Sequence, residues 1–357
     1  MKTITTILGA RPQFIKAAPV SRALANAGIQ EQIIHTGQHF DESMSEVFFR
    51  EMEIPRPAHH LEVNSLGHGA MTGRMLEKVE DILLKGKPDA VMVYGDTNST
   101  LAGALAAVKI HIPVIHVESG LRSFDMKMPE EVNRVLTDRI SSILFCPTTT
   151  AVKNLHEEGF GNYPCRIEQV GDVMYDSVLF YLDKARKTSD VIRRLRLEKQ
   201  SFALATIHRA ENTDNPNRLS GIVDALNEIH KTVDVVVPLH PRTRRHLSTL
   251  KTPAQFTIIE PIGYFDMLMM LDHAKLVLTD SGGLQKEAYF FRKFCITLRD
   301  QTEWVELVEA GANTLAGADS RKIVEAFHRH KDDSIRDSKL YGNGDASVKI
   351  ATILGGF

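Results

Sequence analysis

The stretch Leu276-Val277-Leu278-Thr279-Asp280-Ser281-Gly282-Gly283-Leu284-Gln285-Lys286-Glu287 is the strongest single indication of the fold. An apolar run ends at Thr-Asp, two glycines follow, and a helical pattern begins directly after them. This order predicts a strand, a tight turn and a helix N-terminus, where free N–H groups and the helix dipole favour phosphate. No Lys-Ser/Thr pair follows the glycines, so the turn is not a Walker loop. We expect a nucleoside diphosphate there; the alternative is a turn that serves packing alone.

Similar apolar runs alternate with longer amphipathic stretches along the whole chain. We predict strands at Thr3–Leu8, Gln32–His35, Ala90–Tyr94, Val114–Val117, Ile143–Cys146, Ile167–Val170, Ala203–Thr206, Val233–Pro238, Phe256–Ile259, Leu276–Leu278 and Cys295–Leu298. Helical patterns lie between them, for example Gln13–Ala27 and Arg218–Lys231. This alternation is typical of doubly wound parallel sheets. Because the series occurs twice, we expect two Rossmann-like α/β domains, residues 1–171 and 172–345, with a ligand cleft between them.

Composition restricts the class of protein. The 357 residues are 43% hydrophobic and 25% charged, which is ordinary for a soluble globular protein, and the net charge of -2 gives no basic field for nucleic acid. No apolar stretch approaches the roughly 18 residues of a membrane span. The three cysteines are far apart and form no CxxC pair, so we expect no disulfide or zinc site and a cytoplasmic location.

Polar residues follow the predicted strands of the first half, where α/β proteins place their functional groups. Arg11 follows the first strand and can bind an anion with two hydrogen bonds. Asp96 follows the predicted strand Ala90–Tyr94, where an N-cap is the alternative role. Glu118 ends an apolar strand, so it needs either a partner such as Arg122 or a chemical task. Glu130 opens a helix with Pro at its start, a position that the helix dipole also favours.

The second half carries histidines and arginines at its strand ends. His208 and Arg209 follow the first strand, His240 and Arg242 follow the second, and Arg299 follows Cys295–Leu298. A single histidine is more often structural, but two such corners in the same half as the glycine turn favour a functional site. Several carboxylates sharing that site would have separated pKa values, as acid–base chemistry requires.

Six motifs, taken in order, resemble those of the non-hydrolysing UDP-N-acetylglucosamine 2-epimerases over essentially the whole chain. They are Gly9-Ala10-Arg11-Pro12, Gly95-Asp96-Thr97, His116-Val117-Glu118-Ser119-Gly120-Leu121-Arg122, Pro129-Glu130-Glu131-Val132-Asn133-Arg134, His208-Arg209-Ala210-Glu211-Asn212 and Thr279-Asp280-Ser281-Gly282-Gly283. The resemblance implies a glycosyltransferase-B-like pair of domains, a homodimer, and a last helix near 346–357 that returns to the first domain. It also implies inversion at C2 of a UDP-2-acetamido sugar by elimination and re-addition of UDP, without a cofactor or a metal.

The same resemblance assigns roles residue by residue. Acid–base or elimination-assisting roles are implied for Asp96, Glu118, Glu130 and His208, with the order of the proton transfers left open. UDP-binding positions are implied at Arg11, Ser281, Gly282, Gly283 and Glu287, with Tyr264 a candidate neighbour of the uracil. Arg209, His240, Arg242 and Arg299 complete the predicted binding set.

Two segments depart from the best-known members of the family. Thr302-Glu303-Trp304-Val305-Glu306 and Ser123-Phe124-Asp125-Met126-Lys127-Met128 look more like the branch that acts on UDP-2,3-diacetamido-2,3-dideoxy-glucuronic acid in O-antigen synthesis. Its uronate would need a cation, for which Arg122, Lys127 and Arg299 are candidates. Phe40-Asp41-Glu42 replaces the segment that binds a second substrate in activated members, so we expect hyperbolic kinetics.

The alternative functions are a UDP-N-acetylglucosamine 2-epimerase, a UDP-sugar glycosyltransferase, a hydrolysing epimerase and a UDP-sugar-binding module without catalysis. A dehydrogenase is disfavoured because Gly9-Ala10-Arg11-Pro12 is not the Gly-x-Gly-x-x-Gly turn that binds dinucleotides.

Overall fold

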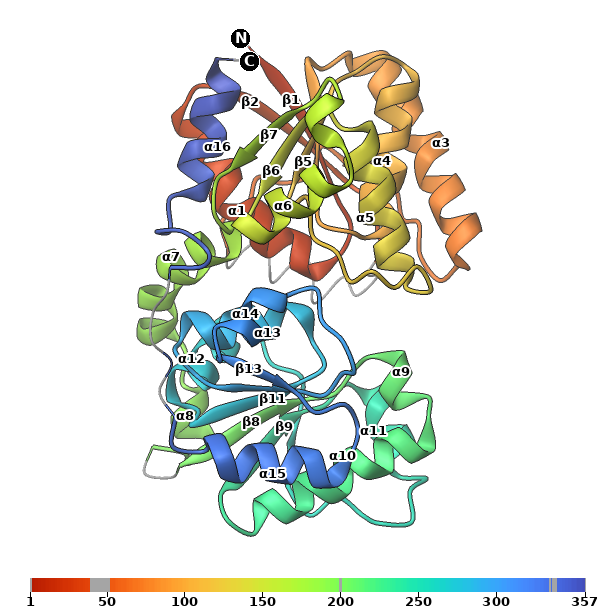
Figure 1. Cartoon of the computed structure of the whole chain (residues 1–357). Helices are drawn as coiled ribbons and strands as arrows, with labels where there is room; N and C mark the ends of the chain where they lie inside the picture. Colours follow the sequence, from red (N-terminus) through yellow and green to blue (C-terminus); the bar gives the residue numbers. More distant parts are fainter. Residues whose placement is uncertain (1, 39–51, 199–200, 334, 336–338, 357) are drawn as a thin grey trace. The chain divides into compact units, whose positions relative to one another are not determined.

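The computed structural model describes residues 2–38, 52–198, 201–333, 335 and 339–356. The chain divides into two compact units: unit 1 is formed by Met1–Leu179 with Lys339–Phe357, and unit 2 by Phe180–Ser338. The division falls inside a single helix, α7 (Val173–Thr188), beyond the predicted limit at residue 171. Each unit has its own parallel sheet (Figure 1).

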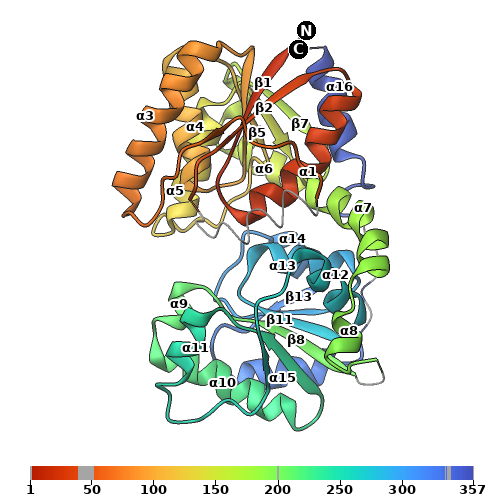
Figure 2. The same cartoon turned by 180° about the vertical axis from the view of Figure 1, so that it is seen from behind.

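Unit 1 is built on a seven-stranded sheet with the order β3-β2-β1-β4-β5-β6-β7, and all its strand pairs are parallel. Its strands are β1 Thr3–Leu8, β2 Gln30–His35, β3 His59–His60, β4 Ala90–Tyr94, β5 Val114–Val117, β6 Ile143–Cys146 and β7 Arg166–Gln169. Its helices are α1 Arg11–Asn26, α3 His68–Gly86, α4 Asn98–Lys109, α5 Pro129–Ile140, α6 Thr149–Glu157, the short η1 Phe160–Asn162, and α16 Ala346–Gly355. Helices α1 and α16 pack together on one face, and α3, α4 and α5 lie on the other (Figure 2).

Unit 2 has a six-stranded parallel sheet with the order β10-β9-β8-β11-β12-β13. Its strands are β8 Phe202–Thr206, β9 Asp234–Pro238, β10 Thr257–Ile259, β11 Leu276–Thr279, β12 Cys295–Thr297 and β13 Asn313–Leu315. Its helices are α8 Val191–Arg194, α9 Ala210–Thr213, α10 Pro216–His230, α11 Pro241–Leu247, α12 Tyr264–His273, α13 Gly282–Phe290, α14 Val305–Glu309 and α15 Ser320–His330. Its core is a cluster of aliphatic and phenylalanine side chains between the sheet and helices α10 and α15.

The predicted strands are confirmed, with shifts of one or two residues at their ends. The sequence patterns missed β3 and β13, which have two and three residues and are too short to show periodicity. The last helix belongs to unit 1, where Asp176 accepts hydrogen bonds from the N–H groups of Ala346 (3.2 Å) and Ser347 (2.7 Å). These bonds satisfy free N–H groups at the start of α16 and hold it against α7.

Candidate active site

In each sheet, the chain adds strands first on one side of the first strand and then on its other side. The predicted site residues follow the strands at this point. In unit 1, β1 lies between β2 and β4; in unit 2, β8 lies between β9 and β11. The loops after such strands separate and leave room for a ligand at the carboxyl ends. Asp96 follows β4, His208 follows β8 and the glycine turn follows β11. The topology therefore places these corners where open α/β sheets bind ligands.

Glu118 is a buried carboxylate just after β5, and its partner is Lys16 of α1. The two side chains are 7% and 9% exposed, so the pair excludes most water. Glu118 has φ 69°, a left-handed conformation that costs a non-glycine residue energy and is concentrated at functional sites. The suggestion that Arg122 is this partner is wrong, because the guanidinium of Arg122 is bound by other carboxylates.

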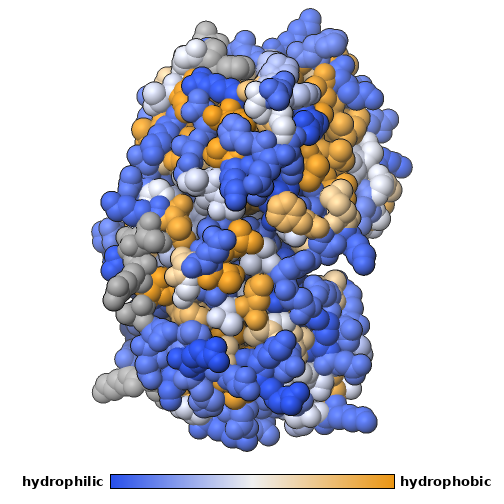
Figure 3. All heavy atoms as spheres, viewed as in Figure 1, coloured by the Kyte–Doolittle hydropathy of each residue, from blue (hydrophilic) through white to orange (hydrophobic). Residues whose placement is uncertain are grey.

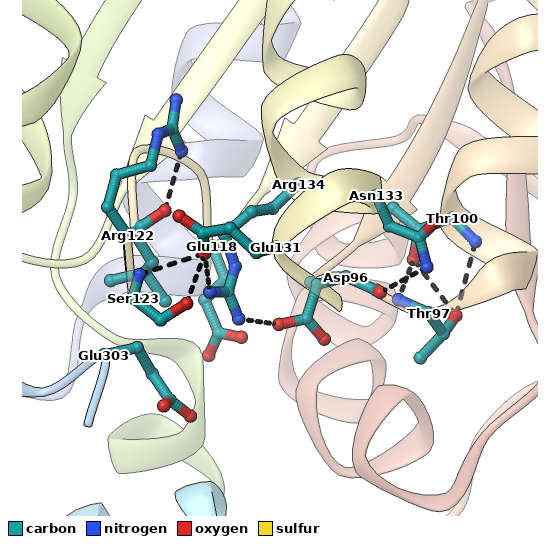
Figure 4. A network of polar contacts seen from close by, with 12 residues as sticks. Asp96, Thr97, Thr100, Glu118, Arg122, Ser123, Glu131, Asn133, Arg134 and Glu303 are labelled. Atoms are coloured by element: carbon teal, nitrogen blue, oxygen red, sulfur yellow. Dashed lines mark hydrogen bonds and ion pairs between the residues drawn. The ribbon is translucent and has the colours of Figure 1, made fainter. Parts of the chain in front are cut away.

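Asp96 forms an ion pair with Arg134 of α5, which also binds Glu131 (Figure 4). The alternative that Asp96 caps α4 is wrong: Thr97 is the cap, and its hydroxyl accepts the N–H of Thr100 at 3.3 Å. The side chain of Asp96 is 28% exposed whereas that of Arg134 is 4% exposed. The carboxylate of Asp96 is therefore partly accessible to a ligand, while the buried guanidinium of Arg134 holds it in place.

Glu131 has a structural role. Its carboxylate accepts the N–H groups of Ser123 and Phe124 and the hydroxyl of Ser123, each at 2.9 Å (Figure 4). These bonds fix the loop between β5 and α5. Its neighbour Glu130 is partly exposed at the second position of α5, and no ion pair of Glu130 is seen in the described residues.

Behind these groups, a buried histidine and aspartate join the two corners of unit 1. His116 Nδ1 lies 2.7 Å from Asp138 Oδ1, and its Nε2 lies 2.7 Å from the carbonyl of Gly95. Asp138 also accepts the N–H of Gly120 and binds Arg122 Nη1 at 2.7 Å. Burial alone would raise the pKa of Asp138, but His116 and Arg122 outweigh it and hold that pKa below its usual value. Arg122 also donates two hydrogen bonds to the carboxylate of Glu158.

In unit 2, the buried carboxylate of Asp280 connects the corner after β11 to the corner after β8. It accepts the backbone N–H groups of His208 and Arg209 and the side-chain amide of Asn212, each at 3.1 Å. The Nδ1 atom of His208 lies 3.1 Å from Asp280 Oδ1. Burial would raise the pKa of Asp280, but His208 and the N–H donors lower it. The His208 side chain is 54% exposed and can be reached by a ligand.

The glycine turn opens α13 as predicted. Ser281 is the N-cap, with its hydroxyl accepting the N–H of Leu284 at 3.4 Å, and Gly282 and Gly283 form the first turn. A side chain at position 282 would place its Cβ 2.4 Å from Glu303 Oε1, so the Glu303 carboxylate would have to move to accommodate it. Glu303 in turn binds Arg299 at 2.8 Å, and Arg299 is buried.

The remaining predicted residues differ in how accessible they are. Arg11 begins α1 and Arg209 precedes α9, and both are partly exposed. His240 and Arg242 are exposed, and Arg242 binds Asp214 at 2.9 Å. Glu287 is largely buried within α13. Tyr264 is 1% exposed and its ring packs against Tyr181, so here it is a core residue whose ring is not presented to a uracil.

The carboxylates of unit 1 and the histidine of unit 2 are suited to moving protons, and the start of α13 is suited to holding a diphosphate. In the described part of the chain, no group of three or more His, Cys, Asp or Glu side chains could hold a metal ion. No helix within these same residues is long and apolar enough to cross a membrane.

Residues 22–355 match the model of a protein family described as UDP-N-acetylglucosamine 2-epimerase. The chain belongs to this family. It is 54% identical to the UDP-2,3-diacetamido-2,3-dideoxy-D-glucuronate 2-epimerase of Pseudomonas aeruginosa, over 98% of this chain and 99% of the relative. It is 45% identical to the UDP-N-acetylglucosamine 2-epimerase of Methanocaldococcus jannaschii, over 98% of both chains.

Solved structures of family members have the same fold. The M. jannaschii enzyme in complex with UDP-GlcNAc and UDP superimposes with a TM-score of 0.93 and 44% identity, covering 99% of this chain and 100% of that one. The Neisseria meningitidis enzyme bound to UDP-GlcNAc gives a TM-score of 0.91 at 30% identity, covering all of both chains. The predicted family and the paired Rossmann-like folds are thus confirmed.

Three residues of this epimerase-family site were missed in the sequence: Lys16, Arg134 and Asp138. The one local signal is that Lys16 interrupts the apolar run Phe14-Ile15-Lys16-Ala17-Ala18-Pro19-Val20. Helix α1 buries this run, and a buried lysine normally has a partner. Arg134 and Asp138 fall on the buried side of α5, where charges almost always have partners. Glu131 lies three residues from Arg134 on α5, but the other partners come from distant segments, so local spacing does not name them.

Proposed function

We propose that this protein inverts C2 of a UDP-2-acetamido sugar without hydrolysis, with UDP-2,3-diacetamido-2,3-dideoxy-glucuronate and its manno epimer as the substrate pair. The observation that carries the proposal is the set of cation-paired carboxylates at the corners of unit 1, together with a diphosphate turn and an exposed histidine in unit 2. The similarity to the P. aeruginosa enzyme supports this choice of sugar. The similarity to the M. jannaschii enzyme makes UDP-N-acetylglucosamine the alternative substrate.

The proposed reaction begins when a carboxylate removes the proton from C2 while the C1–oxygen bond breaks and UDP departs. The proton has no adjacent carbonyl to acidify it, so departure of a good leaving group makes its loss feasible. The bound 2-acetamidoglycal then regains a proton on the opposite face of C2 as UDP adds back to C1. Holding both fragments together keeps the return step effectively unimolecular.

Within this proposal, Asp96, Glu118 and Glu130 are the acid–base candidates, and Lys16 and Arg134 keep two of them oriented. Ser281, Gly282 and Gly283 hold the diphosphate at the start of α13, and His208 acts at the departing phosphate. Arg11, Arg209, His240 and Arg242 supply further polar contacts to UDP. Glu287 remains the proposed ribose ligand.

The uronate carboxylate of the preferred substrate needs a cation. Arg122 and Arg299 are each only 2% exposed and are bound by carboxylates of their own unit. Lys127 is exposed, so we propose it as the cation. A Lys127→Met variant should raise KM for the uronate about 10-fold and leave KM for UDP-N-acetylglucosamine unchanged. Equal changes for both sugars would contradict this assignment.

We also propose that the enzyme is a homodimer that works in the cytoplasm, in O-antigen and lipopolysaccharide synthesis. Apolar side chains gather on the part of unit 1 that carries α4 and α5 (Figure 3), where Leu136 of α5 is 46% exposed. Such patches favour association. The three cysteines are free, which suits a reducing compartment. Light scattering on the purified chain tests the dimer.

The decisive test is incubation with each UDP-sugar in deuterated water, without an acceptor, followed by proton NMR. We expect a second UDP-sugar and deuterium at C2 from the diacetamido-glucuronate nucleotide. No deuterium would reject epimerisation, steady release of free UDP would indicate hydrolysis, and turnover of only UDP-N-acetylglucosamine would overturn the choice of sugar. Rates should depend hyperbolically on substrate; Phe40-Asp41-Glu42, which motivates this, lies outside the described residues.

A further inference from the structure

Asp280 directs its carboxylate away from the helix that follows it. The N-cap of α13 is Ser281, so the start of that helix does not use Asp280. The carboxylate of Asp280 instead faces the corner after β8, where it accepts the N–H groups of His208 and Arg209. Asp280 therefore connects the diphosphate turn to the histidine-bearing corner within one compact unit.

The carboxylate of Asp280 contacts both the backbone and the ring of His208. Both the backbone N–H and the ring Nδ1 of His208 lie 3.1 Å from Asp280 Oδ1, so one carboxylate oxygen contacts the residue at two points. Asn212 holds the other oxygen from a third side and is itself anchored to the carbonyl of Leu298 at 2.9 Å. With Asp280 wholly buried and His208 54% exposed, the ring extends outward from a fixed base.

We propose that Asp280 is a positioning residue that keeps the proton of His208 on Nδ1 and thereby presents Nε2 to the departing diphosphate. A carboxylate that accepts Nδ1–H sets both the tautomer and the orientation of an imidazole, as in other His–Asp pairs. The Nε2 atom of His208 has no protein partner in the part of the chain that the structure describes. The inference rests on the proposed function for the identity of the ligand, but the tautomer itself does not.

The tautomer can be read directly from the wild-type protein by long-range ¹H–¹⁵N NMR of labelled histidine. The signals of His208 are identified by their loss in His208→Gln. We expect the Nδ1–H form for the neutral ring, and a shift toward Nε2–H in Asp280→Asn. An Nε2–H ring in the wild type would overturn the proposal, whether or not the enzyme epimerises any sugar and whether or not the variant folds.

Kinetics test whether Asp280 acts through His208. Asp280→Asn should lower kcat on the order of 100-fold, as loss of a residue that orients a catalytic imidazole does. In a His208→Gln background, the same change should lower kcat by less than about threefold, because residues that act as a unit are not additive. Equal losses in both backgrounds would show that Asp280 is structural only.

Asp176 offers a matched control. It is also buried, and its carboxylate accepts two backbone N–H groups and the hydroxyl of Ser347 (2.6 Å), but no histidine among the described residues pairs with it. Asp176→Asn should lower the melting temperature while kcat stays within about twofold and the His208 signals do not move. If kcat fell as far as in Asp280→Asn, a general effect of losing a buried carboxylate would explain both variants and the proposal would fail.

Discussion

Each unit holds a wholly buried aspartate against a histidine, and the two pairs differ in what the second ring nitrogen meets. In unit 1, His116 is fully buried between Asp138 and the carbonyl of Gly95, so both ring nitrogens are occupied. In unit 2, the ring of His208 contacts Asp280 through Nδ1 and is 54% exposed. A histidine whose two ring nitrogens both contact the protein stabilises the fold, whereas one whose Nε2 is accessible can act on a ligand. The pairing alone therefore does not identify a functional histidine.

The largest effect on turnover should come from removing the exposed histidine of the His208–Asp280 pair. We expect His208→Gln to lower kcat about 1000-fold, since an acid–base or phosphate-contacting group contributes on that scale. Its unfolding free energy should change by less than about 1 kcal/mol because the ring is half exposed. Turnover is measured by NMR and stability by urea unfolding. A large loss of stability with unchanged kcat would reverse the assignment of the two histidines.

The buried pair of His116 and Asp138 should instead contribute mainly to stability. His116→Gln leaves the buried carboxylate of Asp138 without its ring donor, so we expect a loss of about 3 kcal/mol in unfolding free energy. His246 serves as a control, because its contact with Asp214 (3.8 Å) lies at the surface, with the two side chains 39% and 45% exposed. His246→Gln should cost less than about 1 kcal/mol. Equal costs in the two variants would mean that burial of His116 adds nothing.

A smaller effect should follow from filling the turn beside the open histidine. Gly282→Ala puts a Cβ where Glu303 now approaches and where a diphosphate would bind. We expect the Kd for UDP to rise about 10-fold, roughly 1.4 kcal/mol, by isothermal titration calorimetry. Gly69→Ala in α3 is the matched change, since nothing lies within 4 Å of its Cβ. Unchanged UDP affinity in Gly282→Ala would place the diphosphate elsewhere.

The smallest expected effect is on the stability of the protein at acidic pH. The pKa of Asp138 and that of Asp280 are both lowered by their partners, so the folded state binds fewer protons than the unfolded chain. Their stabilisation is complete above the unfolded value of about 3.9 and is lost as pH falls below it through the folded pKa. Urea midpoints at pH 5 and pH 3 should therefore fall less steeply in Asp138→Asn than in the wild type. Parallel slopes would show that Asp138 is not held ionised.

The arrangement of the strands and the corner positions could be read from the sequence because both depend on local patterns. Apolar runs followed by Gly, Asp or His placed Asp96, Glu118, His208 and Ser281 at the carboxyl ends of strands, and the structure agrees. Tyr264 shows the limit of such reading. A tyrosine at a helix start does not reveal whether its ring faces solvent or the core, and here it packs into the core.

What the sequence determined by itself is the family, the two parallel sheets and the strand ends that carry the chemistry. Tertiary structure alone decided which charges pair. Glu118 binds Lys16 rather than Arg122, and Asp138 binds His116, because residues 102 and 22 positions apart are brought together only when the strands and helices pack. A buried charge must find a partner, but local spacing cannot name it, since the partner is whichever opposite charge the fold brings within hydrogen-bond distance.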